Sequence, residues 1–252
     1  MDSTARQNEI LRVLKENDSI KILELSSLLR VSRETIRNDL YLLEKKGLVK
    51  KFRGGAILEA AVDETSYNSR LKQNHAAKHD IAKKFVSFIE KGDVVYLDYG
   101  TTCLEVAKLL KRHKGLTIIT NSIPIINELY KCSGIKLVVL GGEVRGNEGT
   151  LYGTEAVMAL ENYNISIGFI SGSGIIETAG LSNHHIAEAT LTRAAIKQCQ
   201  QVFVGVDHSK FGNVFLNKII SIDSIDTLIT DKITDQDLVE KIKKKTNLIF
   251  AK

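Results

Sequence analysis

One face of a predicted helix near the N-terminus carries side chains that can bind DNA. Arg33, Arg37 and Tyr41 follow one another at intervals of four within residues 33–46, so they share one face of that helix. Guanidinium groups near a helix N-terminus can hydrogen-bond to base edges and phosphates when the helix lies in the major groove. The sequence therefore predicts a recognition helix for double-stranded DNA.

A basic hairpin is predicted to follow this helix. Gly47 is predicted to end the helix. Gly54-Gly55 then separates residues 48–53 from residues 56–58, which are predicted to pair as a wing that touches the DNA backbone. The side chains predicted to contact DNA are Ser32, Arg33, Thr35, Arg37, Asn38, Tyr41 and Lys45 around the helix, and Lys50, Lys51 and Arg53 on the hairpin. The alternative to a DNA-binding domain with a wing is a helical bundle with a charged surface, which does not explain the Gly-Gly hairpin.

Three short helices are predicted to position the recognition face. They cover about residues 6–14, 22–29 and 33–46, and Ser32 is a suitable N-cap for the third. The residues predicted to face inward are Ile10, Leu11 and Leu14 in the first helix, Leu25, Leu28 and Leu29 in the second, and Ile36, Leu40 and Leu43 in the third. Residues 1–57 are therefore predicted to form a winged helix-turn-helix domain.

The distribution of charge supports this division. Residues 1–57 hold 12 Lys and Arg against 8 Asp and Glu, whereas the rest of the chain holds 23 against 22. An excess of positive charge confined to one end is typical of a DNA-binding domain attached to a near-neutral body. The length of 252 residues allows two domains. We expect a connector over residues 58–74 and a second domain over residues 75–252.

The second domain is predicted to be a Rossmann-like α/β sheet. Near-continuous apolar runs of the kind found in buried parallel strands lie at residues 94–97, 116–119, 135–140, 165–170, 202–206 and 227–229. Helices are predicted at residues 103–110, 124–130 and 184–199. Alternating strands and helices predict a layered α/β fold that binds ligands at the carboxyl ends of its strands.

Polar residues and glycines gather at these predicted strand ends. Gly100, Thr101 and Thr102 link a strand directly to a helix, whose first N–H groups can bind a phosphate. Arg145 and Lys210 follow later strands and can pair with an anion. The residues predicted to bind an effector are Asp98, Gly100, Thr101, Thr102, Thr120, Asn121, Ser122, Gly142, Arg145, Gly172, Ser173, Asp207 and Lys210. Each is also an ordinary turn or cap residue, and the prediction depends on their convergence at one sheet edge.

Several other kinds of chemistry are not indicated. Cys103, Cys132 and Cys199 are odd in number and widely spaced, so we expect reduced thiols. The six histidines show no metal-ligand spacing, and Gly172-Ser173-Gly174 lacks the third glycine of a dinucleotide motif. We expect no cofactor, no metal and no catalytic residues. Neither a leader nor a membrane-spanning run is recognisable, so a soluble cytoplasmic protein is expected.

The motifs resemble those of the DeoR family of regulators along nearly the whole chain. In the first domain the resemblance is carried by residues 31–40 and by Gly54-Gly55-Ala56. In the second it is carried by Asp98-x-Gly100-Thr101-Thr102, Thr120-Asn121-Ser122, Gly141-Gly142-x-x-Arg145, Gly153 and residues 207–212. The resemblance implies a sensor domain related in fold to sugar-phosphate isomerases. It further implies a phosphorylated sugar or related effector that releases the protein from its operator, and a homo-oligomer, either a dimer or a tetramer.

The chain departs from the family pattern at five positions. Asn38 stands where the family usually has Arg, and Arg53 where it usually has His. Ser166, Ser171 and Thr192 stand where the family often has Asp, Gly and Lys. Arg193 and Glu188 are kept in the same helix. Because Thr192 removes a positive charge that a phosphate could use, the identity of the effector is not implied by the family.

Two other functions remain open from the sequence. The chain could be a sugar-phosphate isomerase-like enzyme with an accessory DNA-binding head, with Asp98, Glu188 or Asp207 as the general base. It could also be an activator that needs no effector. The prediction made here is a non-enzymatic repressor of a sugar-utilisation operon.

Overall fold

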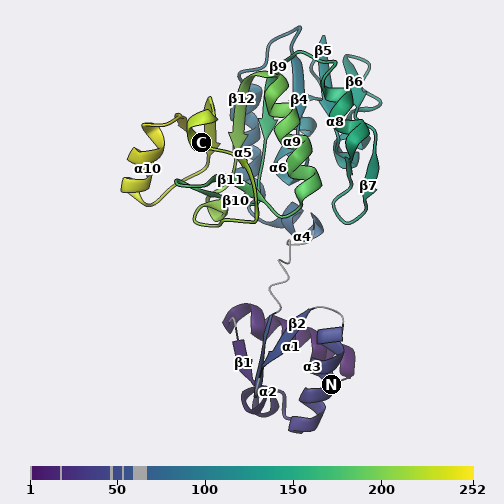
Figure 1. Cartoon of the computed structure of the whole chain (residues 1–252), viewed down its shortest axis with the longest axis vertical. Helices are drawn as coiled ribbons and strands as arrows, with labels where there is room; N and C mark the ends of the chain where they lie inside the picture. The colour runs from purple at the N-terminus through teal and green to yellow at the C-terminus, as the bar shows by residue number, and fades with distance from the viewer. Residues whose placement is uncertain (1, 18, 46–47, 53, 59–66) are drawn as a thin grey trace. The chain divides into compact units, whose positions relative to one another are not determined.

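A computed structural model describes residues 2–17, 19–45, 48–52, 54–58 and 67–252. The chain divides into two compact units, Met1–Asp63 and Glu64–Lys252. Figure 1 shows the elements of each unit, and each is described by itself.

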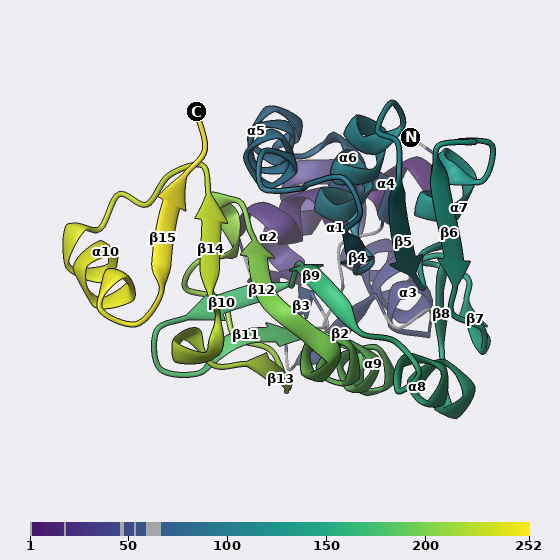
Figure 2. The same cartoon turned by 90° about the horizontal axis from the view of Figure 1, so that it is seen from above.

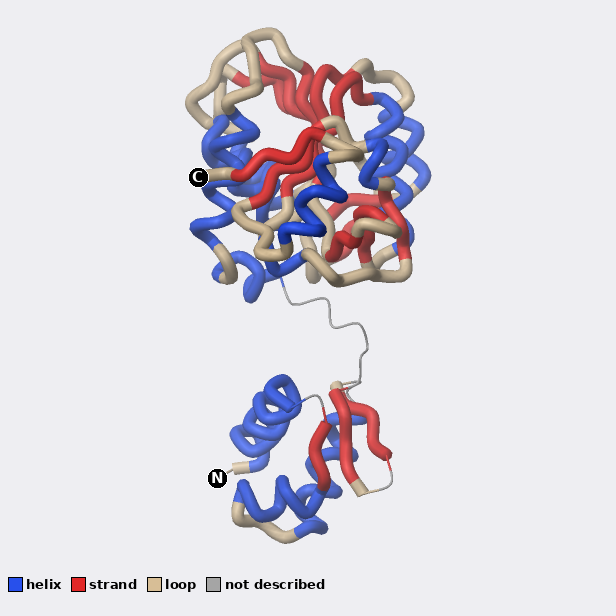
Figure 3. The backbone as a smooth tube through the Cα atoms, turned by 90° about the vertical axis from the view of Figure 1, so that its left-hand side faces the viewer, coloured by secondary structure: helices blue, strands red, loops and turns tan. Residues whose placement is uncertain are grey.

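The first unit is a winged helix-turn-helix. Its elements in chain order are α1 (Ser3–Asn17), β1 (Ser19–Lys21), α2 (Ile22–Leu29), α3 (Arg33–Lys45), β2 (Val49–Phe52) and β3 (Gly55–Leu58). The strands form an antiparallel sheet in the order β1-β3-β2, drawn in red in Figure 3. Ile10, Leu14, Leu25, Ile36, Leu40 and Leu43 are fully buried at the centre of this unit. The prediction that Ile36, Leu40 and Leu43 of α3 face inward is therefore confirmed.

Two features of this unit differ from the prediction. Leu28 was expected to face inward, but its side chain is 56% exposed. With 3.6 residues per turn, Ile22 and Leu29 lie on one side of the buried Leu25, and Leu28 lies on the other. Arg30 then ends α2 in the left-handed region, with φ of 52°. The second feature is the strand β1, which was not predicted. Its three residues are too few to show an alternation of apolar and polar side chains. Gly47, the predicted helix stop, lies outside the described residues.

The second unit is built on a parallel sheet of seven strands. The strands are β4 (Val94–Leu97), β5 (Leu116–Thr120), β6 (Ile135–Val139), β9 (Ile165–Ile170), β12 (Cys199–Gly205), β14 (Thr227–Thr230) and β15 (Asn247–Phe250). Their order is β15-β14-β12-β9-β4-β5-β6, and every neighbouring pair is parallel. The chain runs outward from β4 to β6, then returns to β9 and continues the other way. The direction of winding thus reverses between β4 and β9, where α/β sheets usually bind ligands.

Helices cover both faces of this sheet, as Figure 2 shows. They are α4 (Tyr67–Lys72), α5 (His75–Val86), α6 (Thr101–Leu110), α7 (Ile123–Leu129), α8 (Thr154–Leu160), α9 (Ile186–Gln198) and α10 (Gln236–Lys243). One core cluster packs α5, α6 and α7 against the sheet, and a second packs α8 and α9 against the opposite face. The sheet is therefore buried on both faces, which explains why its strands are continuous apolar runs.

Smaller elements surround the sheet. A hairpin consists of β7 (Glu143–Arg145) and β8 (Thr150–Tyr152), and a three-stranded antiparallel sheet consists of β10 (Gly174–Ile176), β11 (Gly180–Asn183) and β13 (Asn217–Ile220). Two 3₁₀ turns lie at His208–Lys210 and Ile222–Ser224. The six predicted strands are all present. The short strands, β15, α5, α8 and α10 were not predicted, and α4 lies within the segment predicted as a connector. Among the described residues no helix is both long and apolar enough to cross a bilayer.

Candidate functional site

The predicted recognition face is the outer surface of α3. Arg33, Arg37 and Asn38 are exposed, as is Tyr41, and Thr35 is half-buried. Arg37 Nη1 lies 3.0 Å from Glu34 Oε2, and both side chains are more than half exposed, so this ion pair leaves the guanidinium accessible. The hydroxyl of Ser32 accepts a hydrogen bond from Thr35 N at 3.1 Å and caps the start of the helix.

A buried acidic residue holds α3 against α1. The side chain of Asp39 is almost fully buried, and its Oδ2 atom lies 2.5 Å from Arg6 Nε. Ser3 Oγ donates to Asp39 Oδ1 at 3.2 Å, and Gln7 Nε2 donates to the same atom at 3.4 Å. A buried carboxylate without partners would destabilise the folded state, so the donors from α1 are needed for α3 to pack with Asp39 inside. Sequence reasoning missed Asp39. Its position between Ile36 and the apolar residues Leu40 and Leu43 was the available signal.

The predicted wing is the hairpin of β2 and β3, whose register pairs Phe52 with Gly55. Lys51 is exposed, and its ammonium lies 2.8 Å from Glu44 and 5.0 Å from the centre of the Tyr41 ring. The side chain of Lys50 and the whole of Arg53 lie outside the described residues. Lys45, at the end of α3, is exposed.

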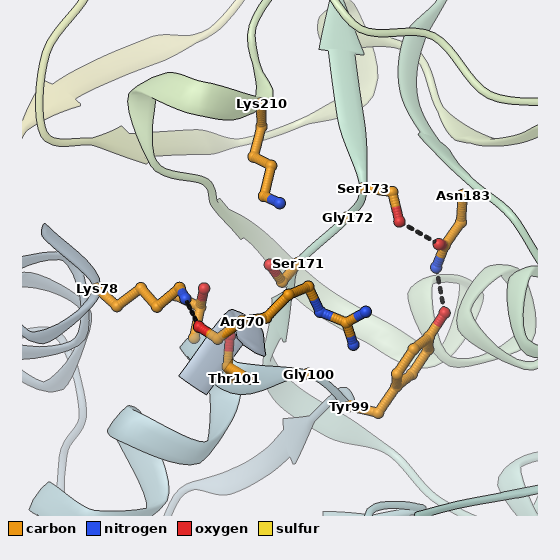
Figure 4. Close-up of a pocket in the computed structure, with 11 residues that line it drawn as sticks. Arg70, Lys78, Tyr99, Gly100, Thr101, Ser171, Gly172, Ser173, Asn183 and Lys210 are labelled. Atoms are coloured by element: carbon orange, nitrogen blue, oxygen red, sulfur yellow. Dashed lines mark hydrogen bonds between the residues drawn. The ribbon is translucent and has the colours of Figure 1, made fainter. Parts of the chain in front are cut away.

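A cavity in the second unit opens at the carboxyl ends of β4, β9 and β12. It encloses about 430 Å³ of empty space, part of which is open to solvent. Loops from three adjacent strands supply its walls, close to the point where the winding of the sheet reverses. Its lining residues are Arg70, Lys78, Tyr99, Gly100, Thr101, Thr102, Ser171, Gly172, Ser173, Asn183 and Lys210 (Figure 4).

The N-terminus of α6 lies in one wall of this cavity. Gly100 is the N-cap residue, with φ of 101°, and no side chain caps the helix there. That φ is in the region that favours glycine. The first N–H groups of a helix have no partner within it, and they carry the positive end of the helix dipole. Together with the hydroxyls of Thr101 and Thr102, this wall can bind an anion.

Three cationic side chains line the same cavity, namely Arg70, Lys78 and Lys210, and the lining residues include no carboxylate. Burial lowers the pKa of Lys78 to about 8; the Asp207 carboxylate opposes this shift, and the charges of Lys210 and Arg70 add smaller contributions to it. Burial also lowers the pKa of Lys210, opposed by the Asp207 carboxylate and reinforced to a smaller extent by Arg70. Burial therefore disfavours the charged forms of Lys78 and Lys210, and a bound anion would favour them.

Comparison with known proteins assigns both units. A family model described as the DeoR-like helix-turn-helix domain matches residues 6–61, and one described as the DeoR C terminal sensor domain matches residues 73–232. The chain belongs to the DeoR family. The resemblance seen in its motifs is thereby confirmed, and the protein is a DNA-binding transcriptional regulator.

Three relatives illustrate the extent of the similarity. The chain is 36% identical to the HTH-type transcriptional repressor GlcR of Bacillus subtilis, over 90% of this chain and 88% of the relative. It is 34% identical to the regulator GolR of Listeria innocua, over 94% of each. It is 31% identical to the glycerol-3-phosphate regulon repressor of Escherichia coli K12, over 92% of each. A solved ribose 5-phosphate isomerase A from Methanocaldococcus jannaschii superposes on 55% of each chain, with 20% identity and a TM-score of 0.42.

Neutral hydrogen-bonding groups form the far side of the DeoR sensor cavity. Asn183 links Ser173 to Tyr99, since Ser173 Oγ donates to its Oδ1 atom at 2.6 Å and its Nδ2 atom donates to the Tyr99 hydroxyl. Ser171 Oγ donates to the Gly205 carbonyl at 3.0 Å. Figure 4 shows this chain of side chains beside the cationic groups. Hydroxyl and amide groups of this kind can bind sugar hydroxyls.

Only part of the predicted effector set lines the cavity. Gly100, Thr101, Thr102, Gly172, Ser173 and Lys210 do so. Asp207 does not line the cavity, and it accepts hydrogen bonds from Asn74 Nδ2 at 2.9 Å and Ser209 N at 3.0 Å. Thr120, Asn121 and Ser122, at the carboxyl end of β5, are buried and do not line the cavity.

Two further predicted residues, Gly142 just before β7 and Arg145 at its end, do not line the cavity. A Cβ atom on Gly142, whose φ is 114°, would come within 2.2 Å of the Tyr152 carbonyl oxygen, so glycine is needed for the close approach of the strands. Arg145 pairs with Glu188 of α9. Both residues therefore have structural roles in this fold.

Sequence reasoning did not assign Arg70, Lys78, Tyr99, Ser171 or Asn183 to the cavity. Arg70, Asn74 and Lys78 recur at intervals of four, but Arg70 is in α4 and Lys78 in α5, and Asn74 between them has φ of 50°, so this spacing does not place them on one helix face. Asn74 bonds Asp207, and the two cations line the cavity. The segment predicted as a connector thus contributes Arg70 to the site.

Asp98 was predicted to bind the effector but is completely buried and does not line the cavity. Burial raises the pKa of Asp98 to about 7, opposed by hydrogen bonds from Tyr99 N and from the Thr192 and Tyr96 hydroxyls. Thr192 Oγ1 lies 3.2 Å from Asp98 Oδ1. Thr192 stands where the family often has Lys. In this chain a hydroxyl, and not an ammonium, therefore contacts Asp98.

Proposed function

We propose that the chain represses a sugar-utilisation operon and that a phosphorylated sugar, bound in the sensor cavity, releases it from operator DNA. The observation that carries this proposal is the grouping of Arg70, Lys78 and Lys210 around the N-terminus of α6 without a lining carboxylate. A phosphate group matches this arrangement in charge, and the hydroxyl and amide groups opposite match a sugar.

The proposed DNA contacts are those of the outer face of α3 and the adjoining hairpin. Exposed Arg33, Arg37 and Asn38 would contact base edges, and Lys51 would contact a phosphate. Helix-turn-helix proteins usually bind two half-sites as dimers, so we propose that the chain acts as a homo-oligomer, a dimer or a tetramer. The names of the relatives, which include a repressor of a glycerol-3-phosphate regulon, support both the repressor role and the phosphorylated effector.

The enzymatic alternative has little support in the cavity. Its lining residues include neither a carboxylate nor an imidazole that could act as a general base. Asp98 is fully buried, and Glu188 is fully buried in its pair with Arg145. We therefore propose that the sensor unit binds its ligand without turning it over.

A thermal-shift titration of the full chain tests the effector. Matched pairs of free and phosphorylated sugars would be added, with Lys210→Gln as the comparison variant. A ligand at ~100 times its dissociation constant should stabilise the native state by about 2.7 kcal/mol. We expect stabilisation by a phosphorylated sugar, none by its free form, and a loss of the effect in Lys210→Gln. Equal stabilisation by the free sugar would contradict the proposed phosphate site.

The response of DNA binding is tested with a duplex selected from a random pool by the wild-type chain. Adding the stabilising sugar phosphate should lower the affinity for this duplex, by roughly 5- to 150-fold for an ordinary coupling. No change in affinity would favour the effector-independent alternative.

A further inference from the structure

Arg70 of α4 lies across the effector cavity and is held there by a buried carboxylate. Its guanidinium forms an ion pair with Glu148, whose side chain is only 1% exposed. Figure 4 shows the Arg70 side chain extending through the middle of the cavity, with its guanidinium on the side of Tyr99 and with Lys210 opposite. An anion that enters the cavity therefore meets a guanidinium that already has a carboxylate partner.

A second cavity cation holds the same helix. The ammonium of Lys78 donates to the Gln73 carbonyl at 2.7 Å and to the Arg70 carbonyl, so it binds the C-terminal end of α4. The last carbonyls of a helix lack partners within it, and a cation there is stabilising. The position of α4 thus depends on two of the three cations that line the cavity.

The two ends of the Arg70–Glu148 pair belong to different parts of the unit. Arg70 is in α4, the first described helix after the boundary between Asp63 and Glu64. Glu148 is in the turn between β7 and β8, and its N–H donates to the Arg145 carbonyl at 3.3 Å. The pair therefore ties the beginning of the sensor unit to the hairpin that packs on α9.

We infer that Arg70 exchanges partners when the effector binds. In the free protein the Arg70 guanidinium pairs with Glu148. In the complex it pairs with the anionic group of the effector instead. This inference rests on the proposed function, because it describes how effector binding at the same site changes the protein. A phosphate dianion carries more charge than a carboxylate and offers several oxygens to the guanidinium fork, so it can compete with Glu148.

The exchange changes the structure on both sides of the pair. Glu148 cannot remain buried and charged without its cation, so the β7–β8 turn moves to let it reach water or another donor. α4, which begins at Tyr67, loses its tie to that turn. The effector can shift this equilibrium only by binding the exchanged state more tightly than the held state.

Phosphate binding to five full-length variants, one of them a double substitution, tests the exchange, with inorganic phosphate as the probe in isothermal titration. Glu148→Gln keeps the size of the side chain and removes the competing charge, so phosphate should bind roughly fivefold more tightly, or better, than to wild type. Glu128→Gln is the matched control, because Glu128 pairs with Lys111 on the surface and does not line the cavity. It should bind like wild type. Lys210→Gln should bind more weakly, and Arg70→Lys, which lacks the fork, should gain nothing from an added Glu148→Gln change.

Hydrogen exchange of the backbone supplies the second measurement. Phosphate should speed exchange in the peptide that covers residues 67–72 of wild type, and in Glu148→Gln this peptide should exchange fast without phosphate. If Lys210→Gln weakens phosphate binding while Glu148→Gln matches wild type in affinity and in exchange, the partner exchange is wrong and the cavity proposal stands. If neither wild type nor Glu148→Gln binds phosphate, the proposed phosphate site is wrong, and the exchange is overturned with it.

Discussion

Arg145 of β7 and Glu188 of α9 form an ion pair in which Arg145 Nη1 lies 2.6 Å from Glu188 Oε2 and the Glu188 side chain is completely buried. The hydroxyl of Thr150 donates to the other carboxylate oxygen. These contacts fasten the β7–β8 hairpin to α9. Arg145 therefore neutralises a buried charge within the protein, although its position after a strand suggested an effector contact.

Replacing Arg145 should cost stability more than ligand affinity. In Arg145→Gln the buried Glu188 keeps its charge without a cation, and breaking such a pair destabilises a protein by about 3–5 kcal/mol. Urea unfolding of the sensor transition in the full chain measures the loss. Arg112→Gln, at an exposed surface position, is the control and should be near neutral. If Arg145→Gln unfolds like wild type but no longer binds a sugar phosphate, Arg145 has the effector role after all.

Arg37 and Arg12 offer a matched test of the recognition helix. Each arginine pairs with a glutamate three residues earlier, Arg37 on α3 and Arg12 on α1. Arg37→Ala should weaken binding to the selected duplex by about 1–3 kcal/mol, as expected for the loss of a base or phosphate contact. Arg12→Ala should bind nearly as wild type does. Fluorescence anisotropy with a labelled duplex measures both, and equal affinities would exclude Arg37 from the interface.

The architecture was predictable because its signals are local. The strands β4 and β9 are buried on both faces, so each is a short apolar run with the bounds expected from the sequence. The helix α3 combines a cap at Ser32 with regular apolar spacing. The short strand β1 escaped prediction because its pairing with β3 is a tertiary contact, made by residues 34 to 38 positions away.

The cavity was only half predictable. Thr101 and Lys210 follow strands directly, and the fold brings the carboxyl ends of those strands together. Arg70 comes from a six-residue helix before the first strand of the sheet, where no periodicity announces a site. Asp98 was wrongly expected to line the cavity. The sequence places it at a strand end but does not show which way its side chain points. It points into the core.

Anion binding should weaken as the pH rises through about 8. Burial lowers the pKa of Lys78 from an ordinary 10.5 to about 8, so above that pH the cavity loses one of its positive charges. Lys210, whose pKa is also lowered by burial, adds to the loss. Sulfate is a suitable probe because its charge is constant over this range. Its affinity, titrated between pH 7 and 9, should fall in wild type and fall less in Lys78→Arg, which stays charged. A wild-type affinity that does not change would contradict the role of Lys78.

The buried Asp98 should make the sensor unit less stable as the pH rises from about 4 to about 7. Its pKa is raised from 3.8 to about 7 by burial, so within this range the folded protein keeps a proton that the unfolded chain has lost. Because the folded state binds more protons, its stability falls with rising pH, by up to roughly 4 kcal/mol for a shift of about three pKa units. Asp98→Asn is neutral at every pH, so its stability should fall less over this range.

The measurement is the free energy of unfolding in urea at several pH values. Asp237→Asn is the control for removing one carboxylate, since Asp237 is largely exposed in its pair with Lys241. It should keep the wild-type slope. Thr192→Lys gives the opposite test, because an ammonium beside Asp98 would favour the charged carboxylate and lower its pKa. A wild-type slope that persists unchanged in Asp98→Asn would assign the pH dependence to other groups and leave Asp98 ionised in the folded protein.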